Sequence, residues 1–229
     1  MKSGTIIGAG ALLATTGRSG NTEGLGLDQI GIEAERRGTI AVNGHYQTEI
    51  PHVYAVGDVI GFPALASTSM EQVRGAMVHA FDLKYKTDVA HILPYGNYTI
   101  PECSIAGETE ESLQKKGIDY VVGRARYRAN SRGQIIGDDE GFLKLMFDFE
   151  EMNLLGVHII GEQASELVHV GLTALLTKAN SDLFIQTCYN YSTLSEVYNY
   201  ATYDALGAKA RRLEEAELAK KSAKKASAG

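Results

Sequence analysis

The stretch VYAVGDVIG, residues 53–61, places a carboxylate directly after a short apolar run. Its first four residues are typical of a buried strand, which Gly57 and Asp58 end. Ligands of open α/β sheets bind beyond the carboxyl ends of the strands, where a carboxylate accepts hydrogen bonds from sugar hydroxyls. A helix predicted from Leu65 directs free backbone amides toward the same crevice, which suits a phosphate group. The alternative is that Asp58 only caps this helix, but Pro63 stands between the two.

Length and composition limit the functional classes. The chain has 229 residues, of which 44% are hydrophobic and 22% charged, and its formal net charge is -6. This length predicts one large or two modest domains. The acidic balance argues against a nucleic-acid partner and against an anionic membrane surface, because both favour a basic face.

Cysteine usage and hydropathy predict a cytoplasmic protein. Cys103 and Cys188 are too few for a disulfide framework and are not spaced as a C-x-x-C redox pair. No apolar run approaches the roughly 20 residues that span a bilayer, so we expect no membrane partner. Gly8 and Gly10 interrupt the apolar opening of the chain and Arg18 follows early, which argues against a targeting segment.

The pattern of residues in the sequence changes near residue 95. Before it, the pattern predicts strands over 6–14, 39–43 and 52–57, and a helix over 65–84 whose packing side carries Val73, Met77 and Phe81. After it, the pattern predicts strands over 119–130, 141–153 and 154–161, helices over 109–117 and 162–179, and a final helix. Residues 95–207 are therefore expected to form an α+β domain, with an antiparallel sheet and helices on one side. Residues 208–229 are expected to be a charged, flexible tail.

Several motifs have a structural explanation. GAGALLATTG, residues 8–17, lacks the third glycine of a dinucleotide fingerprint because Leu13 stands in its place. His158 and His169 lie on an apolar strand and an apolar helix without metal-ligand spacing, so we expect structural histidines and no metal site. We interpret the following cluster of tyrosines mainly as a packing or interface stripe: Tyr189, Tyr191, Tyr198, Tyr200 and Tyr203.

Taken in order, several motifs resemble the carboxyl-terminal half of the flavin-dependent pyridine nucleotide-disulfide oxidoreductases. The motifs are ATTGR at 14–18 followed by Asn21, YAVGD at 54–58, Leu65-Ala66, TIPE at 99–102, GVHIIG at 156–161 and A-x-E-L at 164–167. The resemblance covers residues 5–206. It implies that residues 1–94 are the remnant of nicotinamide- and flavin-binding domains, the latter of α/β type. It implies that residues 95–207 are the interface domain, which makes a homodimer, and that 208–229 follow as the tail.

The resemblance also implies cofactors and site residues. FAD is the expected cofactor, and the nicotinamide nucleotides NAD and NADP are the expected substrates. By motif position, Asp58 accepts a hydrogen bond from the ribityl or pyrophosphate region of FAD. Gly17, Arg18 and Gly57 belong to the same cofactor-binding set. The Leu65 and Ala66 pair is expected to offer backbone amides to the isoalloxazine edge.

The stretch YNYSTLSE, residues 189–196, distinguishes branches of that family. The disulfide reductases have a His-Pro pair here, and the His serves the other subunit as acid and base for a thiol pair, oriented by a Glu. This chain has Tyr191 and Ser192 in those places and keeps Glu196. A tyrosine hydroxyl, with an ordinary pKa of about 10, is a poor thiol base at neutral pH. We therefore expect no disulfide reduction, no catalytic residue in this chain, and a cofactor-binding role for Tyr191.

Within the family, the chain is similar to the soluble NAD(P) transhydrogenases, which also have Tyr at this place but keep the Pro that Ser192 replaces. That implies hydride transfer between NADH/NAD and NADPH/NADP through FAD, which needs no thiol base. The family's amino-terminal half, with its G-x-G-x-x-G and nicotinamide domain, is not in this sequence, so we expect the chain alone to be inactive. Two alternatives remain: a non-catalytic dimerisation module, and a dihydrolipoamide dehydrogenase-like relative, against which Tyr191 argues.

Overall fold

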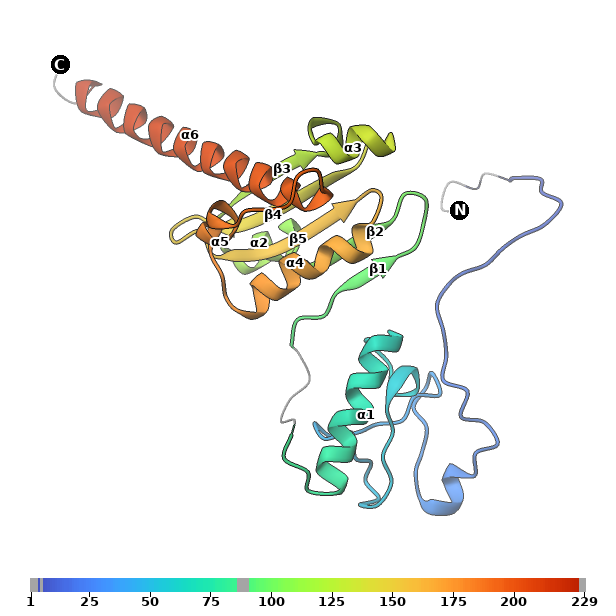
Figure 1. Ribbon diagram of the computed structural model, residues 1–229. Coiled ribbons are helices and arrows are strands. Elements are labelled where there is room, and N and C mark those ends of the chain that lie inside the picture. The colour runs from blue at the N-terminus through green and yellow to red at the C-terminus, as the bar shows by residue number, and fades with distance from the viewer. Residues whose placement is uncertain (1–3, 5, 86–90, 227–229) are drawn as a thin grey trace. The chain divides into compact units, whose positions relative to one another are not determined.

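A computed structural model describes residues 4, 6–85 and 91–226 of the chain, with side chains as far as residue 222. The residues fall into two compact units, Met1–Ala90 and His91–Gly229, which we call the first and the second unit. Figure 1 shows the elements of both, and each unit is described by itself.

The second unit is built on a five-stranded antiparallel sheet with the strand order β1-β2-β5-β4-β3. Its strands are β1 (Tyr95–Asn97), β2 (Cys103–Gly107), β3 (Tyr120–Arg126), β4 (Phe142–Asp148) and β5 (Leu154–Ile160). Alternate residues point to opposite faces of a strand. In β4, Leu143, Leu145 and Phe147 are fully buried on one face, while Lys144 lies on the other. One face of the sheet therefore carries the core.

Helices α4 (Ala164–Leu176) and α6 (Val197–Ala226) pack on that core face. Gly123 of β3 marks the closest approach of α6, because a Cβ built there would lie 1.8 Å from the Ala201 carbonyl oxygen. Tyr198 of α6 is fully buried, and its hydroxyl donates to the Leu167 carbonyl oxygen at 2.7 Å and accepts from the Gly171 amide at 3.1 Å. The buried phenol thus joins the two helices without leaving an unpaired polar atom.

Four further helices complete the described parts of the two units. They are α2 (Glu110–Lys116), α3 (Ser131–Ile136) and α5 (Ser181–Gln186) in the second unit and α1 (Ala66–Ala80) in the first, with 3-10 turns at Leu27–Ile30, Gly57–Ile60, Tyr127–Ala129 and Leu194–Glu196. Capping residues define both ends of helix α2. Thr109 and Ser112 form a reciprocal capping box, and Gly117 closes the helix in the left-handed conformation.

The fold class and most of the elements predicted for the second unit are confirmed. The three predicted strands and the α2 and α4 helices form, and the sheet with its helices confirms the α+β class. The expectation that all helices lie on one side is wrong for α2, whose Glu110 bonds to Lys144 on the face opposite α4 and α6. Strands β1 and β2 lie in stretches for which the sequence pattern predicts no strand. The segment from residue 208 to Ala226 is helical, as part of α6.

The strands predicted in the first unit are wrong. Residues 6–14, 39–43 and 52–57 form no strand, and the one antiparallel bridge among the described residues of this unit joins Tyr54 to Gln47, which lies outside the predicted segments. Gly57–Ile60 is a 3-10 turn. A strand exists only where a neighbouring backbone supplies a continuous ladder of hydrogen bonds. Among the described residues of this unit, turns and single contacts take up these backbone groups instead.

Helix α1 forms within the predicted range, but it buries a different face. Thr68, Gln72 and Ala76 are buried, whereas Val73 and Met77 are each 44% exposed. A buried polar contact lies on this face, since the Gly57 amide donates to Oε1 of Gln72 at 2.7 Å. This contact orients α1 by a hydrogen bond that hydrophobic periodicity does not record.

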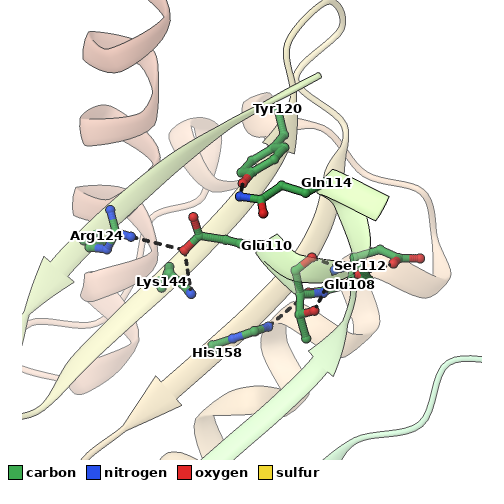
Figure 2. A network of polar contacts seen from close by, with 9 residues as sticks. Glu108, Glu110, Ser112, Gln114, Tyr120, Arg124, Lys144 and His158 are labelled. Carbon is green, nitrogen blue, oxygen red and sulfur yellow. Dashed lines mark hydrogen bonds and ion pairs between the residues drawn. The ribbon is translucent and has the colours of Figure 1, made fainter. Parts of the chain in front are cut away.

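A polar network covers part of the sheet face opposite α4 and α6 (Figure 2). Arg124, Lys144 and His158 are cross-strand neighbours in one row of β3, β4 and β5. Glu110 of α2 accepts from Nζ of Lys144 at 2.9 Å and from Arg124 at 3.3 Å. The carboxylate thus offsets the mutual repulsion of cross-strand cations. His158 Nε2 lies 3.0 Å from the Glu108 carbonyl oxygen, so it is a satisfied structural histidine, as predicted.

The network makes the second unit sensitive to acid. Burial lowers the pKa of His158, and the Lys144 ammonium lowers the pKa of Glu110. Hydrogen bonds from Lys116 and Ser112 lower that of Glu108. For all three groups the unfolded state binds protons more readily, so stability is lost as pH falls.

We expect the urea midpoint, followed by circular dichroism at 222 nm, to decline in two stages as pH falls. The first begins below about pH 6.5, the ordinary pKa of His, and the second below about pH 4.5 as Glu108 and Glu110 take up protons. His158→Gln should remove the first stage and Glu110→Gln should weaken the second. A profile that is flat between pH 7 and pH 3 contradicts this account.

Candidate functional site

A concave pocket in the first unit brings together part of the predicted site. Its volume is about 610 Å³. Gly17, Arg18 and Asp58 all line it, although 40 residues separate Arg18 from Asp58 in the sequence. Ala64, at the approach to α1, lines it as well. The pocket thus joins the turn after residue 14, the end of the YAVGD motif and the entry of a helix.

Arg18 and Asp58 face each other in this pocket. Nη1 of Arg18 donates to Oδ2 of Asp58 at 2.7 Å, and their side chains are 80% and 42% exposed. An ion pair this exposed contributes little free energy, on the order of 0–1 kcal/mol. Both groups are therefore available to a ligand at small cost: the carboxylate as an acceptor for hydroxyls, the guanidinium as a donor to phosphate.

Gly57 sets the direction of Asp58. It has φ of 80° and is buried, and its amide is held by Gln72 as described above. A Cβ there would lie 3.0 Å from Oγ of Ser69, so a larger residue would be strained by the backbone conformation and would crowd Ser69. Gly57 does not line the pocket itself. Its role in the geometry is to turn the chain so that the next side chain reaches the pocket.

The amino-terminal end of α1 supplies backbone donors beside the pocket. Leu65 is the N-cap residue, and no side chain caps the helix. The carbonyl oxygen of Leu65 accepts from the Ser69 amide at 2.9 Å, as in any first helical turn, while the three preceding amides, of Ala66, Ser67 and Thr68, have no such intrahelical partner. Oγ1 of Thr68 is buried without a hydrogen-bond partner among the described residues. An uncapped helix start with its positive dipole end favours an anionic or electron-rich group.

Arg37 is a pocket residue that the sequence reasoning missed. It lines the pocket together with Arg18. Two glycines cause this proximity: the Gly20 amide donates to the Arg37 carbonyl oxygen at 2.7 Å, and a Cβ on Gly20 would lie 1.9 Å from the Gly38 carbonyl oxygen. Only a pair of glycines allows the two turns to touch. The sequence feature that could have indicated this proximity is the presence of two glycine turns that each contain arginine, GRSGN at 17–21 and RRG at 36–38.

Tyr191, the remaining predicted site residue, lies in the second unit. Its side chain is 80% exposed, and its hydroxyl accepts a hydrogen bond from Oγ of Ser131 at 2.9 Å. Glu196 does not bond to Tyr191. Its Oε2 accepts from the Thr193 amide at 3.2 Å and from Nδ2 of Asn130 at 3.4 Å. The carboxylate that orients an acid–base residue elsewhere in the family is here engaged with the loop itself.

Other reactive groups form no further site in the described part of the chain. Cys103 and Cys188 are free thiols. The described residues contain no group of three or more His, Cys, Asp or Glu side chains arranged to hold a metal ion. None of the helices in the described ranges is long and apolar enough to cross a membrane.

The pocket suits a ligand that combines hydroxyls with phosphate. Arg18, Arg37 and the carboxylate of Asp58 line it, and the uncapped start of α1 follows the lining residue Ala64, although Leu65 and Ala66 do not line the pocket themselves. The guanidinium groups and the helix start recognise phosphate oxygens, and the carboxylate recognises a polyol. An FAD molecule presents both in its ribityl chain and pyrophosphate, so the residues present fit that cofactor.

Two family models match the chain. The dimerisation domain of the pyridine nucleotide-disulphide oxidoreductases matches residues 93–202, and the pyridine nucleotide-disulphide oxidoreductase model matches residues 1–80. Together they cover most of the chain.

Relatives with similar sequences are soluble pyridine nucleotide transhydrogenases. The protein of that name from Yersinia enterocolitica is 43% identical over 209 residues, which are 90% of this chain and 45% of that protein. Its counterpart from Mycobacterium tuberculosis is 46% identical over 207 residues, 90% of this chain and 44% of the relative. The chain thus spans less than half the length of the curated relatives it matches.

Solved structures share the fold. The HOCl-induced flavoprotein disulfide reductase RclA from Escherichia coli superposes with a TM-score of 0.78 at 22% identity, over 82% of this chain and 44% of that one. LpdA from Mycobacterium tuberculosis gives a TM-score of 0.73 at 25% identity, over 81% of this chain and 40% of that one. These matches confirm the fold class expected from the sequence.

Proposed function

The chain belongs to the pyridine nucleotide-disulphide oxidoreductase family, and we propose that it supplies FAD-binding and dimerisation segments to a soluble pyridine nucleotide transhydrogenase. That enzyme passes hydride between NADH/NAD and NADPH/NADP. The proposal includes a homodimer formed through the second unit, and a cytoplasmic location in keeping with the free cysteines.

The identity of residue 191 favours hydride exchange between nicotinamides over disulfide reduction. An exposed tyrosine, bonded to Ser131, stands where the disulfide reductases place their histidine. The neighbouring carboxylate, Glu196, is engaged with Thr193 and Asn130. A thiol–disulfide reaction needs a group that exchanges protons near neutral pH, and this loop lacks one. Hydride exchange between nicotinamides needs no such group, and the relatives with 43–46% identity carry the transhydrogenase name.

The residues of the first unit have separate tasks in this proposal. Arg18 and Arg37 hold the pyrophosphate of FAD, and Asp58 accepts from a ribityl hydroxyl once Arg18 turns toward phosphate. The free amides at Leu65 and Ala66 face the electron-rich edge of the ring system. When bound, FAD supplies the chemistry by taking a hydride from one nicotinamide and giving it to another. The protein's contribution is to bind and orient, and Tyr191 offers a hydroxyl toward the cofactor of the other subunit.

Complementation tests this function. The chain is co-expressed with the unmatched part of the Yersinia enterocolitica relative, and the complex is assayed for reduction of thio-NAD by NADPH. We expect transhydrogenation by the complex, none by the chain alone, and no reduction of lipoamide by either. Lipoamide reduction without transhydrogenation would point to the dihydrolipoamide dehydrogenase-like alternative and contradict the proposal.

A dimerisation module is the second candidate, and one observation favours it. The second unit has a continuous core that includes Tyr127, Phe147 and Phe184, all fully buried. The main core cluster of the first unit contains only Ile32, Ile40 and Ala55 as buried residues. If the complex assembles through the second unit yet neither binds FAD nor transfers hydride, the module is the better description.

A further inference from the structure

The loop that carries Tyr191 is tied to the start of α3 through Asn130. This side chain is fully buried. Its Oδ1 accepts from the amides of Arg132 and Gly133 at 2.9 and 3.1 Å, and its Nδ2 donates to the Thr193 carbonyl oxygen at 3.1 Å. One side chain therefore joins two segments 63 residues apart in the sequence. A buried amide with its bonds satisfied on both sides gives the loop a fixed place on the second unit.

The next residue, Ser131, holds the phenol itself. Its hydroxyl donates to the Tyr191 hydroxyl at 2.9 Å. Tyr191 is 80% exposed, so packing contributes little to its orientation. An exposed side chain samples several rotamers and loses that freedom only through a specific contact. The hydrogen bond from Ser131 is such a contact, and it leaves the proton of the phenol free to be donated to an acceptor in front of it.

Glu196 is committed to a different task. With Thr193 it forms a reciprocal capping box at the 3-10 turn Leu194–Glu196, and it also accepts from Asn130. It therefore fixes the backbone of the loop, not the side chain at position 191. The two tasks of shaping the loop and orienting its functional side chain are divided between different residues.

We propose that Ser131 is the positioning residue for Tyr191, and that Asn130 and Glu196 hold the loop on which this contact depends. This inference rests on the proposed function, because only in that function does the Tyr191 hydroxyl meet a cofactor. Its geometry does not depend on that function. Ser131 acts through Tyr191, and the pair presents one hydroxyl donor in a single orientation toward a flavin.

Fluorine NMR of the full chain without flavin tests the contact. 3-Fluorotyrosine is placed at position 191, and its resonance is recorded for the unchanged chain and for Ser131→Ala, Ser131→Thr and Ser195→Ala. We expect Ser131→Ala to move the resonance toward the position it has in the urea-unfolded chain. Ser131→Thr, which keeps the hydroxyl, should retain the native position, and Ser195→Ala, a change in the nearby 3-10 turn, should leave it unaltered.

The outcome that overturns the proposal is a native resonance in Ser131→Ala. Asn130→Ala should broaden the resonance, but it also removes a buried group, so the decision rests on the Ser131 variants. Transhydrogenation by the complemented complex separates this proposal from the proposed function. A resonance that depends on Ser131 in a complex without hydride transfer supports the contact and contradicts the function. Hydride transfer by a complex whose resonance does not depend on Ser131 supports the proposed function and contradicts the contact.

Discussion

Gly123→Ala is expected to destabilise the second unit by about 3 kcal/mol, the upper end of the ordinary cost of overpacking a core. The added Cβ would lie 1.8 Å from the Ala201 carbonyl oxygen and 2.8 Å from Cβ of Ala205. Both residues are fully buried on α6 where it crosses β3. Neither a backbone oxygen nor a short side chain can move aside, so the whole helix must shift. Thermal unfolding followed at 222 nm should show a midpoint lower by about 10 °C.

Gly207→Ala is the matched control for this prediction. It makes the same chemical change on α6, the helix that packs against β3, but a Cβ there meets only Nη1 of the flexible Arg211 side chain, at 3.4 Å. Replacing glycine by alanine inside a helix stabilises it by up to about 1 kcal/mol. The two variants should therefore shift the midpoint in opposite directions. Equal midpoints for Gly123→Ala and the unchanged chain would mean that α6 does not lie against β3 as described.

Asp58→Ala is expected to weaken FAD binding ten- to a hundredfold. Asp58 is the carboxylate that lines the pocket and pairs with Arg18, and in the proposed function it accepts from a ribityl hydroxyl. A hydrogen bond to a charged group contributes about 1.5–3 kcal/mol, and every 1.4 kcal/mol changes an affinity about tenfold. Equilibrium dialysis of FAD against the chain, and against the complemented complex, measures the dissociation constant.

Asp28→Ala serves as the control for this measurement. Asp28 is a carboxylate of the same unit that lines a different concavity. Its loss changes the net charge by the same amount but removes nothing from the pocket around Arg18. A dissociation constant that rises equally in both variants would indicate a general charge effect, and one that rises in neither would remove Asp58 from the cofactor site.

Local chemistry explains where the sequence reasoning succeeded. Helix α2 starts at a capping box and ends at Gly117, features that lie within a few residues of the backbone groups they satisfy. The alternation of Leu143, Lys144 and Leu145 in β4 likewise reads directly as a strand with one buried face. The family motifs are short contiguous strings, so their order along the chain was enough to identify the family.

Where the reasoning failed, the deciding contact is distant in sequence. The sequence by itself determined the α+β class, the strands β3, β4 and β5, the helices α2, α4 and α6, the family, and the motif positions that nominate Asp58 and Tyr191. Tertiary structure alone decided that α1 turns Gln72 inward to meet Gly57, that two glycine turns bring Arg37 beside Arg18, and that Ser131 reaches Tyr191. Periodicity and capping report energies within one or two turns of chain. A hydrogen bond between residues 15 to 60 positions apart leaves no trace in spacing, because it exists only after the backbone has folded.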